Sequence, residues 1–469
     1  MKRKSNALDR KCDDPVRSSS PNTAESETAK RRRLACDDLP PEIVDAILGV
    51  LDIFDLLSAR RVYRQWRGLI TARLRYHTEA LPDQRAFVRE MAARGDLDAV
   101  QRSWPPEVDQ KWQERFLVAA VGGGHLALAR WLAEEKGCYV SAAVCVRAAA
   151  SGRIDMIEWV NGDRPEPVIY EMCDTMAENG HLDALRWYHA RGYKCGDFTC
   201  AYAAKGGHLD VLKWLRSIGC EWTWHVCDWA AAHGHAHVVW WAAENGCEWG
   251  DVCTGFAGSG LFDDLREAHR REDRSMTNAT CDAAAAAGRI DIIEWTLAQG
   301  CTLRANTCRF AIENGHVAVL DWLRAHDCPW HHAMWFCAIV NNHLSVLVWA
   351  AAHDYRPSKH DGNVCDEAAR RGRLSILEWL VVKQGLPIGP TTCKAAAEGG
   401  RLDVLEWLCA RDCPWDERTC ERAATGNHVA TLAWAIEAGC PYSAARCRKR
   451  AERYNSFEII KWLDARPCL

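Results

Sequence analysis

Two stretches that lie far apart in the chain are nearly identical: GHLDVLKWL at residues 207–215 and GRLDVLEWL at residues 400–408. Their pattern recurs along the chain, and its tryptophan position holds Trp131, Trp159, Trp187, Trp214, Trp241, Trp295, Trp322, Trp349, Trp379, Trp407, Trp434 and Trp462. Arg102 and Glu267 occupy the same position in two degenerate copies. Fourteen copies therefore follow one another in steps of 26 to 30 residues. A fixed period in this range is typical of a stacked solenoid.

Each copy predicts two short helices. The first helix carries a Cys followed by mostly small residues and a closing Gly, as in CAYAAKG at residues 200–206. The second helix has apolar residues at 209, 211, 212, 214 and 215, and its polar residues recur at steps of three to four. This spacing is that of a helix with a wide apolar face, as expected of a repeat covered on both sides.

The repeat resembles the ankyrin repeat, with its register matching at five points. Cys200 stands where that family has the Leu of its T-P-L-H element, and Trp214 falls on a helix-two Leu. The interval from Cys220 to Cys227 is only seven residues, about six fewer than an ankyrin repeat of about 33 residues would leave. The residues of the projecting finger are therefore missing. We predict an all-α fold in which an ankyrin-like helix-pair solenoid has shortened loops and little or no strand.

Upstream of the repeats lies DDLPPEIVDAILGVLDIFDLLSARRVYRQWRGLI, residues 37–70. It predicts two helices too short to bury their apolar faces alone, so part of this surface should meet a partner. The segment resembles the F-box on Leu39, Pro40, Glu42, Ile47, Leu48, Leu51, Asp55, Leu56, Val62, Trp66 and Arg67. That resemblance implies docking onto the Skp-family adaptor of a cullin-RING (SCF) ubiquitin ligase. A plainer interpretation is a helical cap on the repeat stack.

The chain thus divides into a disordered basic tail (1–36), a small helical F-box (37–75), a linker helix (76–86) and about fourteen repeats (87–469). The tail holds ten Lys or Arg and five Asp or Glu, a net charge of about +5. Because the whole chain has a net charge of −4, the remainder carries about −9. The acidic body argues against a nucleic-acid partner. The runs at 2–4 and 30–33 are a candidate nuclear import signal.

The sequence has no apolar run of the roughly 20 residues that a membrane span needs, and no apolar stretch like that of a secretory signal at its start. We expect an intracellular, cytoplasmic protein, with nuclear entry depending on the basic runs, and no membrane partner. In a reducing compartment the 24 Cys are expected to be thiols.

The abundance of Cys and His raises the possibility of a metal site. The chain contains no C-x-x-C, and eleven Cys recur once per copy in the first helix, which is typical of a small buried apolar group. At the position just before the second helix, some copies have His, such as His208, and others have Arg, such as Arg401. Both side chains can donate a hydrogen bond to a loop carbonyl, whereas a metal ligand or general base would not tolerate the exchange of His for Arg. We therefore expect no metal, cofactor or catalytic residue.

Residues at which the copies disagree are the candidates for function. Two positions after the first-helix Cys, the copies carry the aromatic residues Tyr202, Trp229 and Phe310, which we predict to bind a partner protein. Trp222 and Trp224, in a loop, join this prediction. The loop tryptophans 222, 224, 249, 330 and 415 have a second interpretation, as filling for the space of the missing finger.

Together these features predict a monomeric, non-enzymatic substrate-recognition adaptor of an SCF-type ligase. The F-box would bind the Skp-family adaptor through Leu39, Pro40, Glu42, Ile47, Leu48, Leu51, Leu56, Val62 and Trp66, and the repeats would bind an unidentified target. This architecture resembles F-box/ankyrin proteins of large DNA viruses of amoebae. Two alternatives stay open: a scaffold that sequesters its partner without ubiquitination, and a Cys/His metal or nucleic-acid protein.

Overall fold

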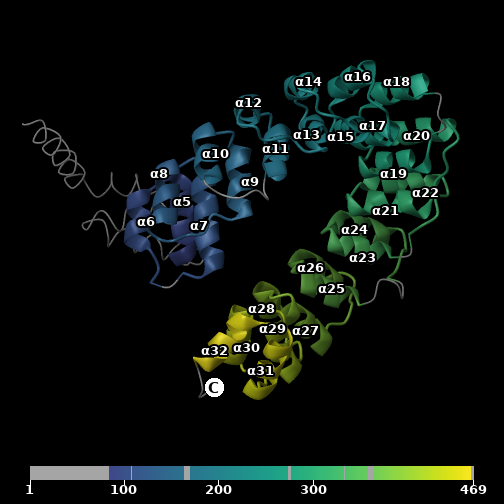
Figure 1. Cartoon of the computed structure of the whole chain (residues 1–469). Coiled ribbons are helices and arrows are strands. Elements are labelled where there is room, and N and C mark those ends of the chain that lie inside the picture. Colours follow the sequence, from purple (N-terminus) through teal and green to yellow (C-terminus); the bar gives the residue numbers. More distant parts are fainter. Residues whose placement is uncertain are drawn as a thin grey trace, which may run out of the picture. The chain divides into compact units, whose positions relative to one another are not determined.

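The computed structural model describes residues 84–106, 108–162, 169–272, 276–331, 333–357 and 363–465. Every regular element in these residues is an α-helix, and 28 helices follow one another as fourteen pairs (Figure 1). This confirms the predicted all-α, helix-pair fold. Odd-numbered helices are the first helices of the pairs and even-numbered helices the second. None of the helices described combines the length and apolar character that crossing a bilayer requires.

The helices fall into two compact units, divided between residues 168 and 169. The first unit contains α5 (Gln84–Arg94), α6 (Leu97–Ser103), α7 (Gln110–Gly122), α8 (Leu126–Glu134), α9 (Ala142–Ser151) and α10 (Ile154–Asn161). The first pair thus begins at Gln84, inside the stretch predicted as a linker helix.

The second unit contains α11 (Ile169–Glu178), α12 (Leu182–Ala190), α13 (Thr199–Lys205), α14 (Leu209–Ser217), α15 (His225–Ala232), α16 (Ala236–Glu244), α17 (Val252–Ser259), α18 (Phe262–Glu272), α19 (Asn278–Ala286), α20 (Ile290–Ala298), α21 (Ala305–Glu313), α22 (Val317–Ala325), α23 (Met334–Val340), α24 (Leu344–Ala352), α25 (Val364–Arg371), α26 (Leu374–Val382), α27 (Pro390–Glu398), α28 (Leu402–Cys409), α29 (Glu417–Thr425), α30 (Val429–Glu437), α31 (Ala444–Arg453) and α32 (Phe457–Asp464).

Within the second unit, each first helix packs on the first helix of the next pair, from α11 through α31. Small residues make this approach possible: Ala203 and Ala204 are fully buried on α13. On α17 the approach is closer still, because a Cβ placed on Gly255 would lie 2.7 Å from the Cβ of Ala231 on α15. The small residues of the first helices thus let neighbouring first helices pack closely.

A side-chain clamp joins consecutive pairs where each first helix ends. The Nε2 atom of His208, which precedes α14, lies 3.1 Å from the carbonyl oxygen of Glu178 at the end of α11. The same bond recurs at His125, His316, His343 and His428, at 2.8–3.1 Å. Where a repeat has Arg instead, the guanidinium replaces the ring: Arg401 donates through Nε to the carbonyl of Arg370 at 3.3 Å. The His/Arg exchange therefore has the predicted structural cause.

The clamp also explains why glycine closes the first helix. Gly207 has φ = 77°, a left-handed conformation that side chains other than glycine's rarely adopt. A Cβ there would also lie 2.5 Å from Nδ1 of His235, the clamp residue of the next pair. The same two reasons hold at Gly180, whose Cβ would lie 2.6 Å from the ring of His208.

A second bond between repeats was not predicted from the sequence. The buried hydroxyl of Thr307, which precedes a first-helix Cys, donates to Asp282 of the preceding repeat at 2.6 Å. It also accepts the backbone N–H of Arg304 at 3.2 Å, so it caps its own helix. Thr199 donates to Asp174, and Thr392 to Asp366, in the same way at 2.6 and 2.7 Å. We call this the Thr–Asp bond.

The second helices bury their aliphatic residues, and Val211, Leu212 and Leu215 are fully inaccessible on α14. The repeat tryptophans lie only partly in the core. Trp349 is buried, and the other eleven, such as Trp407, are half-buried. Their rings lie at the outer edge of the core, where polar groups can reach them: Trp322 donates through Nε1 to Glu294 at 3.0 Å, and the guanidinium of Arg411 lies 3.9 Å from the Trp407 ring.

The Thr–Asp bond predicts a measurable loss of stability when its hydroxyl is removed. Thr307→Val keeps the volume but deprives buried Asp282 of a donor, which should cost about 1–3 kcal/mol. Thr307→Ser retains the hydroxyl and should lose much less. Urea denaturation followed by circular dichroism measures both; equal losses for the two variants would contradict the assigned role.

The clamp predicts a pH dependence of stability. Burial lowers the pKa of His428 below its ordinary value of 6.5. The folded chain therefore favours the neutral ring, and the stability this provides above pH 6.5 is lost as the pH falls through 6.5 toward the lowered pKa. Burial also lowers the pKa of His235, which adds to the effect.

His428→Arg should keep the clamp, as Arg401 does one repeat earlier, while removing this titration. We expect the thermal midpoint of the variant to fall less than that of the unchanged chain between pH 7.5 and pH 5.5. An identical fall in both proteins would show that His428 does not titrate with folding.

Candidate partner-binding surface

The positions two residues after the first-helix Cys lie along one side of the row of first helices. In the second unit, from Thr175 on α11 to Lys449 on α31, all but Ala395 are at least partly accessible. The clamp and core residues repeat, but the side chain in this row differs from copy to copy. The row therefore gives each repeat a different surface side chain.

Tyr202 and Trp229 occupy this row in consecutive repeats, on α13 and α15, and they contact each other. Their ring centroids lie 5.2 Å apart at 75°, an edge-to-face arrangement. Phe198, just before α13, stacks nearly parallel to Trp229 at 6.4 Å. Trp224, just before α15, stacks on His225 at 3.8 Å.

His225 joins the two halves of this group, because its ring also lies 5.3 Å from Phe198 and 5.6 Å from Trp229. We call Phe198, Tyr202, Trp224, His225 and Trp229 the aromatic surface. Phe198 is 45% exposed and Trp224 47% exposed, whereas the other three are half-buried. Rings that pack against one another are held in place before binding, and exposed aromatic residues are common anchors of protein interfaces.

Sequence reasoning therefore found three of the five residues. Phe198 and His225 were missed because they do not occupy the row position. Their proximity arises from the packing of α13 on α15, which brings the starts of the two helices together. The available signal was an aromatic residue two positions before the first-helix Cys at both sites, Phe198 before Cys200 and His225 before Cys227.

Trp222 packs against Trp241 and, among the described residues, makes no ring contact with the aromatic surface. Its ring packs edge-on against Trp241 at 5.8 Å, and the guanidinium of Arg216 covers it at 4.2 Å. Trp330 and Trp415 make the corresponding contact with Trp349 and Trp434, at 5.5 and 6.0 Å. These contacts agree with the alternative interpretation of the loop tryptophans as packing residues.

Phe310 stands apart as well. It lies on α21, three first helices beyond α15, with the guanidinium of Arg309 4.5 Å from its ring. Phe310 is therefore an aromatic residue of the row that is separate from the aromatic surface. The other predicted partner-binding residues, from Leu39 to Trp66 in the F-box, lie outside the described residues.

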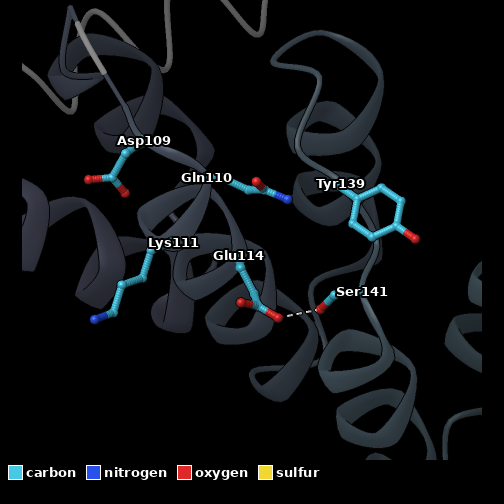
Figure 2. Close-up of a pocket in the computed structure, with 6 residues that line it drawn as sticks. All are labelled: Asp109, Gln110, Lys111, Glu114, Tyr139 and Ser141. Atoms are coloured by element: carbon cyan, nitrogen blue, oxygen red, sulfur yellow. Dashed lines mark hydrogen bonds between the residues drawn. The ribbon is translucent and has the colours of Figure 1, made fainter. Parts of the chain in front are cut away.

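A hollow of about 480 Å³ lies in the first unit, beside the start of α7 (Figure 2). Glu114 accepts a hydrogen bond from the hydroxyl of Ser141 at 2.5 Å, and Tyr139 is 67% exposed. Figure 2 shows Asp109 and Lys111 on the opposite side from Tyr139. The polar side chains do not converge on one point, so this hollow has no arrangement suited to general acid–base chemistry.

Ten of the eleven first-helix Cys are buried, and Cys253 is partly exposed. Burial raises the pKa of Cys200, Cys281 and Cys308 to about 12 each, so these groups stay protonated at neutral pH. The sulfur atoms of Cys393 and Cys413 lie 3.3 Å apart. Across the part of the chain that the structure describes, no three His, Cys, Asp or Glu side chains are arranged to hold a metal ion.

Comparison with known families identifies one domain. The family model of the F-box domain matches residues 36–78, which confirms the predicted F-box. No curated protein matches the chain in sequence.

Solved helical-repeat structures resemble the chain only distantly. The pentatricopeptide repeat protein PPR10 in complex with an 18-nt psaJ RNA element shares 16% identity, with 93% of this chain and 73% of that chain covered and a TM-score of 0.31. PPR10 from maize shares 15% identity, with 94% and 82% covered and a TM-score of 0.30. Similarity this low does not identify the repeat type or its ligand, so the ankyrin type remains a prediction.

The packing of the cysteines predicts that the protein does not need a metal. Protein dialysed against EDTA should contain well below one zinc per chain by elemental analysis, and its thermal midpoint should match that of undialysed protein, because protonated buried thiols are poor ligands. Stoichiometric zinc together with destabilisation by the chelator would contradict the packing role.

Proposed function

We propose that the protein is a substrate-recognition adaptor of an SCF-type ubiquitin ligase. The observation that carries the proposal is the F-box domain at residues 36–78, followed by an array of helix pairs with variable, accessible side chains. The F-box binds the Skp-family adaptor, and the repeats bind the protein to be ubiquitinated. Such an adaptor performs no chemistry of its own.

The mechanism is proximity. One end of the chain is fixed to the ligase and the repeats hold the target, so ubiquitin transfer takes place at high effective concentration. A rigid repeat array suits this task, because the clamps and Thr–Asp bonds hold neighbouring pairs in register. Its intracellular location and its monomeric state belong to the same proposal.

Within the repeats we assign target binding to the aromatic surface. Of the five residues of the aromatic surface, Trp224 and Phe198 are the most exposed, and Tyr202 and Trp229 support them from the row. A partner would bury these rings with an apolar or cationic side chain of its own, since aromatic faces attract both. Trp222 is left out because it packs on Trp241.

In the F-box we assign the adaptor contact to Leu39, Pro40, Glu42, Ile47, Leu48, Leu51, Leu56, Val62 and Trp66. The alternative function, sequestering a partner without ubiquitination, differs in needing no contact between these residues and a ligase. A relation to F-box/ankyrin proteins of amoeba viruses remains a prediction from the sequence.

Affinity purification of the full chain from cells tests the proposal. The unchanged chain should retain the Skp-family adaptor, and the combined Leu39→Ala, Pro40→Ala and Trp66→Ala variant should lose most of it, because the apolar contact is removed. The matched control is Phe198→Ala with Trp224→Ala, which should keep the adaptor and lose proteins captured by proximity labelling while ligase activity is blocked.

Three results would contradict the proposal. Retention of the adaptor by the triple variant would refute the F-box contact. Unchanged labelling by the aromatic variant would remove the aromatic surface from target binding. Unchanged target abundance after loss of adaptor binding would favour sequestration.

A further inference from the structure

A strongly basic hollow of about 770 Å³ lies over the last three first helices, α27, α29 and α31. Seven of the nine residues that line it are Lys or Arg, contributed by all three helices. We call it the basic groove and define it by Lys394, Arg418, Arg422, Arg446, Lys449 and Arg453. Arg422 and Lys449 occupy the variable row position of their repeats, the position that Tyr202 and Trp229 hold in the aromatic surface.

The groove extends beyond a terminal cap. A polar face on a capping repeat would account for basic residues on α31 alone. Arg448 fits that description, because it pairs with Asp464 of α32, the last helix described. Arg418 and Arg422 belong to the preceding repeat and Lys394 to the one before, where capping gives no reason for cations.

Basic groove residues stand at the positions that form the Thr–Asp bond at three other junctions. Lys394 occupies the Asp position and pairs with Asp416 at 2.9 Å. At the next junction Arg446 occupies the Thr position. Glu421, whose side chain is only 11% exposed, reaches Arg450 at 3.3 Å and Arg446 at 3.7 Å. The last two junctions thus replace a compact stabilising bond with long charged side chains, which stability alone does not require.

The groove keeps an excess of positive charge. Seven cations line the hollow, namely the six groove residues and Arg450. Four carboxylates accompany them: Glu398, Asp416, Glu417 and Glu421. No carboxylate of the described residues lies within 4.0 Å of the charged groups of Arg418, Lys449 or Arg453. Arg418 and Lys449 are exposed, so their donors are available to a ligand.

We propose that the basic groove binds an acidic, extended peptide segment of the target protein. Adjacent packed helices lie roughly 8–10 Å apart, and an extended chain in the polyproline II conformation advances about 3.1 Å per residue with three residues per turn. A segment that crosses α27, α29 and α31 in this conformation meets a new helix about every three residues and turns every third side chain to the same face, which predicts acidic side chains at every third position. The identification of the peptide's source as a ubiquitination target rests on the proposed function.

The composition of the groove favours a peptide over a single-stranded nucleic acid. None of the nine lining residues is aromatic, so the groove lacks rings on which bases stack. The carboxylates at Glu398 and Glu417 would also repel a continuous phosphate backbone, whereas a peptide can place neutral residues opposite them.

Fluorescence anisotropy with the full chain tests the proposal. The probes are a labelled peptide with Asp at every third position, the same peptide with phosphoserine at those positions, a peptide of equal charge with its Asp residues contiguous, and single-stranded oligo(U) RNA. We expect both spaced peptides to bind, their binding to weaken with added salt, and the contiguous peptide and RNA to bind more weakly. The stronger of the two spaced peptides identifies the acidic group as carboxylate or phosphate.

Arg422→Glu with Lys449→Glu should weaken binding of the spaced peptides roughly tenfold or more, because two charge-assisted bonds become repulsive. The matched control is Arg130→Glu with Arg147→Glu, which makes an equal charge change at exposed positions of the first unit. Arg147 lies two residues after its first-helix Cys, the same position as Arg422 and Lys449 in their repeats. The control should bind as the unchanged chain does. Arg418→Gln with Lys449→Gln, which breaks no ion pair, should show a smaller loss in the same direction.

The proposal is overturned if the spaced peptides do not bind, if the groove and control variants lose affinity equally, or if oligo(U) binds more tightly than the peptides. Peptide binding needs no Skp-family adaptor. Failure in this assay is therefore distinguishable from failure of the F-box assignment, which the affinity purification measures.

Discussion

The bond from a His or Arg side chain to the last carbonyls of the preceding first helix is the contact on which the array depends. It satisfies a backbone acceptor that would otherwise lack a partner at the helix end, and it fixes one pair against the next. His208 on Glu178 and Arg401 on Arg370 perform the same task with different chemistry. The left-handed glycines exist partly to make room for these side chains. Because the same contact recurs, the row positions on the first helices are free to vary, and binding residues can occupy them without loss of the fold.

Much of the fold could be predicted because it is periodic. The spacing of Trp, Cys and Gly specifies two helices per repeat, and the exchange of His for Arg favours a hydrogen bond that both side chains can make. The burial of the tryptophans could not be predicted, because an apolar pattern does not distinguish the middle of a core from its outer edge. The Thr–Asp bond was also missed. Thr307 and Asp282 are 25 residues apart, and only the stacking of α21 on α19 brings them together.

The candidate site likewise combines residues that the sequence predicts with residues that only helix packing reveals. Tyr202 and Trp229 were found as departures from the repeat consensus and Trp224 as a loop tryptophan, but Phe198 and His225 join them only through helix packing. Trp222 was chosen for its residue type, and its contact with Trp241 shows that type alone is a poor guide. The basic groove has the same origin as the aromatic surface: cations replace consensus residues at two junctions, and their number becomes significant only when three helices are seen side by side.

Hydrogen exchange by mass spectrometry on the full chain, with and without the purified Skp-family adaptor, tests the central claim most directly. The account predicts that adaptor binding slows exchange in peptides from residues 36–78 and leaves peptides from the aromatic surface and the basic groove unchanged. Slowed exchange in the repeats without any change in residues 36–78 would contradict it, because the adaptor would then bind where the target is expected.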